Sequence, residues 1–150
     1  MNSPAVPMTT SHSVAEQLRQ IGLRAVSADL DDFIARAAKA RWSPHQILDQ
    51  LAQAELADRS RRSLERRLRL SGIKRFKSIA DFDWSWPAKI ERDVIERALT
   101  LDFVPEARNL VLVGRNGLGK TMIAQNICHG AVLAGYSVLF RSAAALLEEL

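Results

Sequence analysis

The stretch Gly114-Arg115-Asn116-Gly117-Leu118-Gly119-Lys120-Thr121 matches the pattern G-x-x-x-x-G-K-[ST] of a phosphate-binding loop. Its glycines leave backbone N–H groups open to the oxygens of a triphosphate, and a helix that follows adds further unpaired N–H groups. We expect Lys120 to neutralise the β- and γ-phosphates and the Thr121 hydroxyl to ligate Mg²⁺. All eight residues are predicted to bind ATP with Mg²⁺; for Arg115, an exposed loop position is the alternative.

The residues on both sides of this loop predict the fold around it. The apolar run 109–113 ends at a glycine and is typical of a short strand, the period of 120–133 is helical, and 136–140 predicts a second strand. Strand, glycine loop, helix and strand form a βαβ unit. We therefore predict that residues 109–150 start an α/β domain of the P-loop NTPase class.

The first half of the chain has the apolar spacing of helices. One helix is expected over residues 23–41, and Ser43 with Gln46 forms a capping box at the start of a longer one. Gly72 is expected to end that longer helix. The sequence thus predicts an all-α N-terminal domain over residues 1–72.

Residues 73–108 are expected to form a linker and an entry helix that Pro87 opens. The linker alternates aromatic and polar residues, the aromatic ones being Phe76, Phe82, Trp84 and Trp86. These side chains either fill a domain interface or lie in part beside a bound base.

Positive charge is concentrated in one segment. Between Arg59 and Lys77 lie nine basic residues and one acid, so this segment carries +8, whereas the whole chain carries +4 and the remainder −4. Such a concentration favours a polyanionic partner, contacted through its phosphates because the segment contains no aromatic residue before Phe76. A solvated or protein-docking face is the alternative. The residues predicted to contact DNA are Arg59, Arg62, Arg66, Arg69, Lys74, Arg75 and Lys77.

Composition limits the location of the protein. No apolar run approaches the roughly 20 residues of a membrane span, and residues 1–8 lack the basic and apolar regions of a signal peptide. The single cysteine, Cys128, excludes an internal disulfide and fits a reducing compartment. We predict a cytoplasmic protein without a membrane partner.

An ordered set of segments, together with the loop, carries a family resemblance: Trp42-Ser43-Pro44, Ala54-Glu55-Leu56-Ala57-Asp58-Arg59, Ile79-Ala80-Asp81-Phe82-Asp83-Trp84, Asn109-Leu110-Val111-Leu112-Val113-Gly114 and Ala134-Gly135-Tyr136-Ser137-Val138-Leu139-Phe140. From about Val14 onward the chain resembles the IstB family, ATP-binding helper proteins of bacterial insertion sequences that are related to the DnaC-type helicase loaders among the AAA+ ATPases. Met122-Ile123-Ala124 stands where family members commonly have His-Leu-Ala, which leaves the phosphate and Mg²⁺ groups intact.

The resemblance implies an AAA+ domain that binds duplex DNA in an ATP-dependent oligomer and directs a transposase to its target. It also implies a sheet in which other strands separate 109–113 from 136–140. The Walker B acid, sensor residue and arginine finger of such ATPases are expected to be missing from these 150 residues, so we expect nucleotide binding without hydrolysis. The alternatives are a loader that binds a replicative helicase and the remnant of an interrupted gene.

Overall fold

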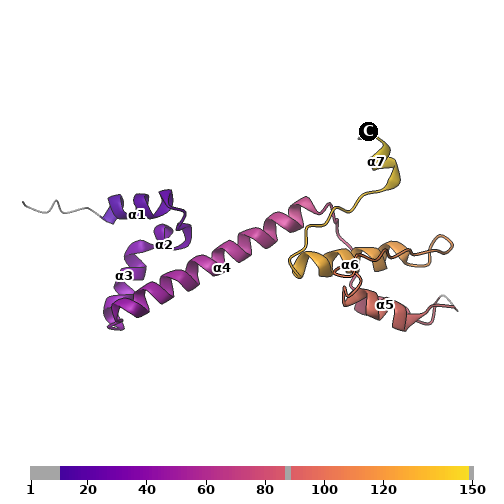
Figure 1. Ribbon diagram of the computed structural model, residues 1–150, viewed down its shortest axis with the longest axis horizontal. Helices are drawn as coiled ribbons and strands as arrows, with labels where there is room; N and C mark the ends of the chain where they lie inside the picture. The colour runs from indigo at the N-terminus through magenta and orange to yellow at the C-terminus, as the bar shows by residue number, and fades with distance from the viewer. Residues whose placement is uncertain (1–10, 87–88, 149–150) are drawn as a thin grey trace, which may run out of the picture. The chain divides into compact units, whose positions relative to one another are not determined.

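The computed structural model describes residues 11–86 and 89–148 (Figure 1) and divides into two compact units, Met1–Arg62 and Ser63–Leu150. The predicted opening of a helix by Pro87, and the segment considered as a signal peptide, fall outside the described residues. The described elements are α1 (Ser11–Gln20), α2 (Arg24–Ala28), α3 (Leu30–Lys39), α4 (Pro44–Leu70), the 3₁₀-helix η1 (Ile79–Asp81), α5 (Arg92–Leu99), α6 (Lys120–Leu133) and α7 (Ala143–Glu148). Within those ranges no helix is long and apolar enough to cross a membrane.

The first unit packs α1, α2 and α3 with the beginning of α4. Its buried centre consists of Val26, Leu30 and Phe33, and Trp42 meets the Phe33 ring edge-on at 5.9 Å between centroids. The predicted capping box is confirmed: the Ser43 amide donates to Gln46 Oε1 at 2.8 Å, and the Gln46 amide to Ser43 Oγ at 3.3 Å. Two otherwise unpaired N–H groups at the start of α4 are thereby satisfied.

The single helix predicted over residues 23–41 is wrong, because the chain forms α2 and α3 with a break at Asp29. The backbone φ of Asp29 is −131°, outside the helical range, and its amide bonds to the Val26 carbonyl in a tight turn. Val26, Leu30 and Phe33 keep a helical spacing across the break and all reach the core. Apolar periodicity therefore gave no sign of the interruption.

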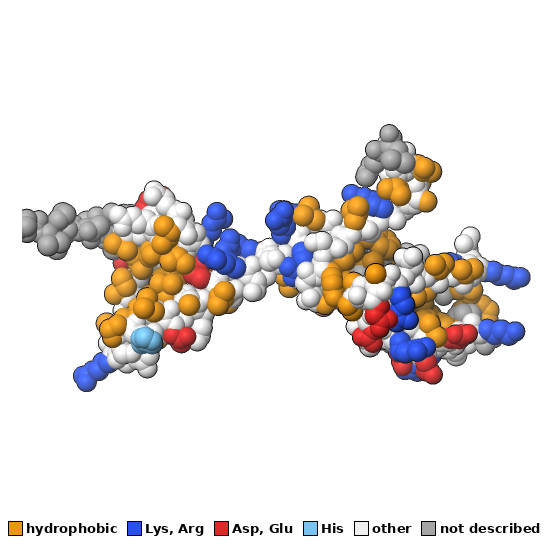
Figure 2. Space-filling model, in the orientation of Figure 1, with side chains coloured by type: hydrophobic (Ala, Val, Ile, Leu, Met, Phe, Trp, Pro, Cys, Tyr) orange, Lys and Arg blue, Asp and Glu red, His pale blue; other side chains and the backbone are white. Residues whose placement is uncertain are grey.

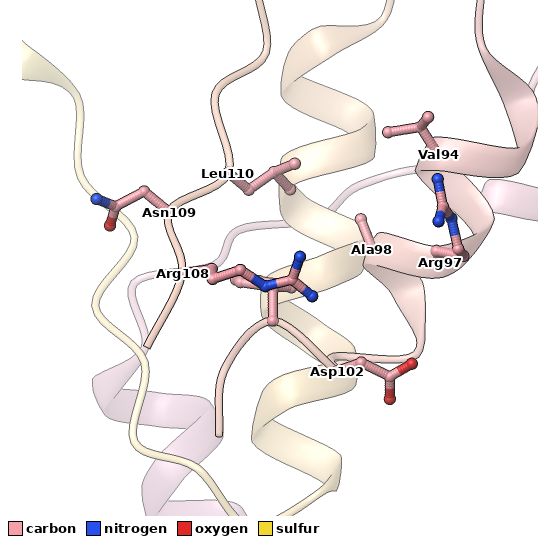
Figure 3. Close-up of a pocket in the computed structure, with 8 residues that line it drawn as sticks. Val94, Arg97, Ala98, Asp102, Arg108, Asn109 and Leu110 are labelled. Atoms are coloured by element: carbon pink, nitrogen blue, oxygen red, sulfur yellow. The ribbon is translucent and has the colours of Figure 1, made fainter. Parts of the chain in front are cut away.

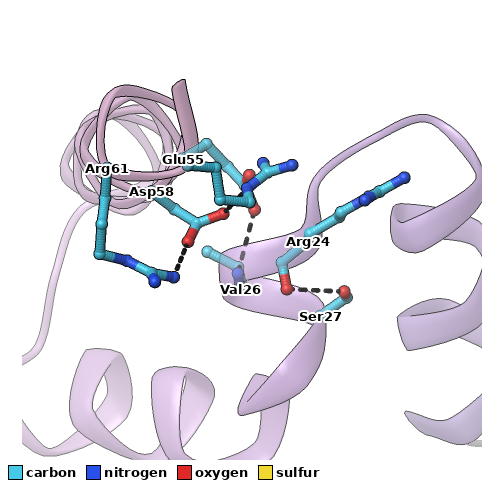
Figure 4. Close-up of polar contacts among 7 residues, drawn as sticks. Arg24, Val26, Ser27, Glu55, Asp58 and Arg61 are labelled. Carbon is cyan, nitrogen blue, oxygen red and sulfur yellow. Dashed lines mark hydrogen bonds and ion pairs between the residues drawn. The ribbon is translucent and has the colours of Figure 1, made fainter. Parts of the chain in front are cut away.

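Glu55 of α4 pairs with the start of α2 (Figure 4). The N-cap residue of α2, Leu23, offers no side-chain acceptor, and instead Glu55 Oε1 accepts a hydrogen bond from the Val26 amide at 3.0 Å. Glu55 is 3% exposed, and its second oxygen has no partner among the described residues. A buried carboxylate thus replaces a local cap and ties α4 to α2.

The second unit is built around α5 and α6, with η1 against α6. Its buried cluster comprises Phe82, Ile95, Ala98, Leu101, Ile123, Ile127 and Ala131. Gly72 ends α4 as predicted: the helix stops at Leu70, and Gly72 takes a φ of +71°, which glycine adopts without strain.

The prediction of an α/β fold is wrong, since the described residues contain helices and no strand. The two predicted strands, 109–113 and 136–140, run without regular secondary structure. An apolar run becomes a strand only when its backbone pairs with a neighbour, and neither segment has a partner strand within the described ranges. Val111 and Val113 are consequently 76% and 90% exposed.

We expect replacement of Glu55 by leucine to lower the free energy of unfolding by about 1–3 kcal/mol, because the Val26 amide would be left buried and unpaired. Glu55→Gln keeps an acceptor oxygen and should cost less. Gln50→Leu, an exposed position on the same helix, is the control. Urea unfolding followed by far-UV circular dichroism measures the differences, and a Glu55→Leu chain as stable as the control would contradict the capping role.

Candidate nucleotide site and basic surface

The glycine loop leads directly into α6. Gly119 is the N-cap residue with a φ of +79°. The first backbone hydrogen bond of the helix is donated by the Ile123 amide to the Gly119 carbonyl at 3.0 Å. The amides of Lys120, Thr121 and Met122 lie in the first turn, where helix geometry provides no acceptor. Three N–H groups and the positive end of a helix dipole are thus available to an anion beside the loop.

A buried aromatic ring fixes the last glycine of the loop. A Cβ atom built on Gly119 would lie 2.5 Å from Cε2 of Phe82, closer than real Cβ contacts come. Phe82 is buried, and Trp84 packs on it with ring centroids 4.8 Å apart. Phe82 belongs to the buried core of the second unit and Trp84 packs against that core, whereas Trp86 is 65% exposed.

Lys120 folds back over the loop. Its Nζ donates to the Gly114 carbonyl at 2.8 Å and to the Arg115 carbonyl at 2.6 Å. Phosphate oxygens of a nucleotide would compete with these two carbonyls for the ammonium group, which sits on a flexible stem. Arg115 itself is exposed.

Thr121 follows on the exposed side of the first turn of α6. Its hydroxyl is the single oxygen ligand that the predicted Mg²⁺ site takes from this chain. The described residues hold no cluster of three His, Cys, Asp or Glu side chains that could bind a metal ion. One hydroxyl fits Mg²⁺, which takes most of its ligands from water and phosphate in such sites.

A hollow of about 380 Å³ lies beside the loop and is lined by Leu118 and Lys120, by Ile90 and Val94 at the start of α5, and by 111–113. Most of the lining residues are apolar, and Lys89, Glu91 and Lys120 are the charged ones. Another hollow, of about 230 Å³, is lined by Arg97, Asp102 and Arg108 among others and includes no loop residue (Figure 3).

Figure 2 shows the Lys and Arg side chains in blue. The basic residues of α4 do not all carry free charge. Asp58, one residue before the basic segment, accepts hydrogen bonds from Arg61 at 2.5 Å and from Arg62 at 2.6 Å. The bond from Arg61, supported by Arg62, lowers the pKa of the Asp58 carboxyl, although burial acts in the opposite direction. Of the two, Arg62 is a predicted DNA contact, and Asp58 offsets part of its charge.

The remaining predicted contacts are distributed over both units. Arg59 is exposed in the first unit, and five more cations are exposed in the second: Arg66, Arg69, Lys74, Arg75 and Lys77. Arg67, which the sequence did not single out, bonds through Nε to the Val132 carbonyl at 3.3 Å and through a terminal nitrogen to Ser63 Oγ at 2.6 Å.

Asn126 holds the connector, defined as residues 71–82, against α6. Its Oδ1 accepts from the Ile79 amide at 2.9 Å, and its Nδ2 donates to the Lys77 carbonyl at 2.9 Å. The Phe76 ring lies 5.3 Å from that of His129 on the next turn of α6. The sequence gave no signal for Asn126, because both of its partners in the connector are backbone groups.

A loop of the pattern G-x-x-x-x-G-K-[ST] at the start of a helix is the mark of the P-loop class of nucleotide-binding proteins. The chain belongs to the family described as IstB-like ATP binding protein, whose model matches residues 16–150.

Three relatives are each 30% identical to the chain. A protein of Pseudomonas aeruginosa, described as an ATP-binding protein of insertion sequence IS21, aligns with 86% of this chain and 49% of its own length. An IS21-like counterpart from Bacteroides fragilis aligns with 82% and 62%, and one of insertion sequence IS5376 from Geobacillus stearothermophilus with 70% and 42%. The chain thus spans about half the length of the curated relatives it matches.

We expect Gly119→Ala to destabilise the second unit, by about 1–2 kcal/mol for the left-handed backbone and about 1–3 kcal/mol for the collision with Phe82. Gly130→Ala is the matched control, since nothing lies within 4 Å of the added methyl group inside α6. The control should gain about 0.5–1 kcal/mol. Thermal unfolding of the two variants compares them, and equal stabilities would refute the contact with Phe82.

Proposed function

We propose that this chain is an ATP-binding helper of DNA transposition, which binds Mg²⁺·ATP at residues 114–121 and the phosphates of duplex DNA through its basic segment, and which assists a transposase. The observation that carries the proposal is that one helix, α6, is attached to both of the predicted binding regions. Its N-terminus bears the loop with Lys120, while Asn126 holds the connector that carries Lys77. The description of the family supports ATP binding, and its insertion-sequence relatives support the context of transposition.

In this proposal the triphosphate lies on the open amides of α6, with Lys120 between the β- and γ-phosphates and the Thr121 hydroxyl toward Mg²⁺. The metal ion would neutralise phosphate charge. The hollow next to Leu118 and Lys120 is of a size to take the base, against apolar lining residues such as Ile90 and Val94. All of these groups belong to the second unit, so that unit alone would hold the nucleotide.

DNA contact in this proposal depends on exposed cations that form no ion pair with a carboxylate among residues 11–86 and 89–148. Arg66 and Arg69 project from the last turns of α4, and the connector adds Lys74, Arg75 and Lys77. Contact with phosphates rather than base edges gives binding that tolerates sequence and weakens steeply with salt.

We expect Lys120→Ala to reduce ATP affinity at least tenfold, because a charge-assisted contact to phosphate is lost. Met122→His, which introduces the residue common in the family, should leave the affinity unchanged. Isothermal titration with Mg²⁺·ATP measures both. Equal affinity in the wild type and Lys120→Ala would show that the loop is not a working nucleotide site.

We expect the double substitution of Arg66 and Arg69 by alanine to reduce the slope of log affinity against log salt for duplex DNA by about 2, since each phosphate contact contributes roughly 0.9. Arg19→Ala combined with Arg92→Ala removes the same charge from residues that pair with nearby glutamates and should leave the slope unchanged. Fluorescence anisotropy over a range of salt concentrations gives the slopes. If both double variants behave alike, net charge and not this surface governs binding.

A further inference from the structure

A hollow of about 280 Å³ in the second unit lies between the last turns of α4 and the turn that follows α6. Helix α4 lines it with Ser63, Arg66, Arg67 and Leu70, and the turn lines it with Gly135 and Ser137. Neither Asp nor Glu occurs among the described residues that form its wall. Two guanidinium groups and two hydroxyl groups therefore meet at one concave place without a counter-charge.

One of the two guanidinium groups is already fixed in place. Arg67 is half-buried and donates to the Val132 carbonyl and to Ser63 Oγ, which uses two of its five N–H groups. A guanidinium held in this way loses little side-chain entropy when it binds an anion, unlike an arginine that is free in solvent. The other, Arg66, is exposed and also lines the hollow, so it is accessible to the same ligand.

The C-terminal end of α6 would repel an anion if its carbonyl groups were free. They are not: the amides of Ala134, Gly135 and Tyr136 bond to the carbonyls of Gly130, Val132 and Ala131 at 2.9, 3.1 and 2.9 Å. Arg67 adds its own hydrogen bond to Val132. The negative end of the helix is thus largely satisfied before any ligand arrives.

We propose that this hollow binds a single phosphodiester group of the DNA backbone, with Arg66 and Arg67 supplying the charge and the Ser137 hydroxyl donating a hydrogen bond. The inference rests on the proposed DNA-binding function and goes beyond it, because it assigns one phosphate to a defined binding site. It also adds Ser137, which lies 60 positions after Lys77, the end of the basic segment. Tetrahedral oxyanions suit paired guanidinium groups, which offer two parallel N–H bonds each.

The decisive variant is Ser137→Ala, because it changes no charge and an exposed serine can be removed without loss of folding. If the hollow is a phosphate-binding site, Ser137→Ala should lose three- to tenfold in DNA affinity, whereas binding to a diffuse electrostatic surface should not change. Ser60→Ala, at an exposed serine of α4 outside the hollow, is the matched control. Ser137→Asp should weaken DNA binding more than tenfold, since it places a negative charge beside both arginines.

The same variants are titrated with duplex DNA, Mg²⁺·ATP and inorganic phosphate to identify the source of the phosphate group. The expected result is a loss for DNA alone, with ATP affinity and melting temperature unchanged. Wild-type DNA affinity in both Ser137 variants overturns the inference while leaving the proposed function intact, provided that the Arg66 and Arg69 double variant still lowers the salt slope. A loss of ATP affinity instead would make the hollow part of a nucleotide site and also overturns it.

Discussion

The side-chain amide of Asn126 is the contact on which the arrangement of the second unit depends. It accepts one hydrogen bond from the backbone of the connector and donates another, and its Nδ2 also bonds to the Met122 carbonyl at 2.8 Å. The position requires a side chain of this length that carries both a hydrogen-bond acceptor and a donor. An ionised Asp has no donor and Leu has neither group, so neither residue could replace Asn126 fully. Because the partners are backbone atoms, the exposed cation Lys77 remains free to face outward.

From this attachment the connector continues to Phe82, whose ring lies in the core and leaves no room for a Cβ atom on Gly119. The apolar face of α6, formed by Ile123, Ile127 and Ala131, packs in the same cluster. Burial of a phenylalanine contributes roughly 1.5–3 kcal/mol, so the loop is positioned by the packing that stabilises the unit. A disturbance of the core would therefore reach the loop directly.

Features that depend on neighbouring residues could be predicted from the sequence, and those that depend on distant residues could not. The start of α6 at the loop, the capping box at Ser43 and the stop at Gly72 all rest on side chains or glycines within a few positions. By contrast, Asn126 and its partner at Ile79 are 47 positions apart. The prediction of strands at 109–113 and 136–140 was wrong for the same reason. An apolar run can be recognised from neighbouring residues, but a strand also needs a pairing partner elsewhere in the chain.

The charge of the basic segment shows how one residue can change the meaning of a sequence pattern. The sum over residues 59–77 omits Asp58, which lies immediately outside and engages Arg61 and Arg62. Since the pKa of Asp58 is lowered, its carboxylate stays ionised as the pH falls below the usual range for aspartate, and both arginines stay engaged. Apart from Arg59, the exposed positive charge that Asp58 does not engage therefore begins at Arg66, in the same unit as the nucleotide loop. Any polyanion drawn to this charge would contact the unit that holds the phosphate-binding loop.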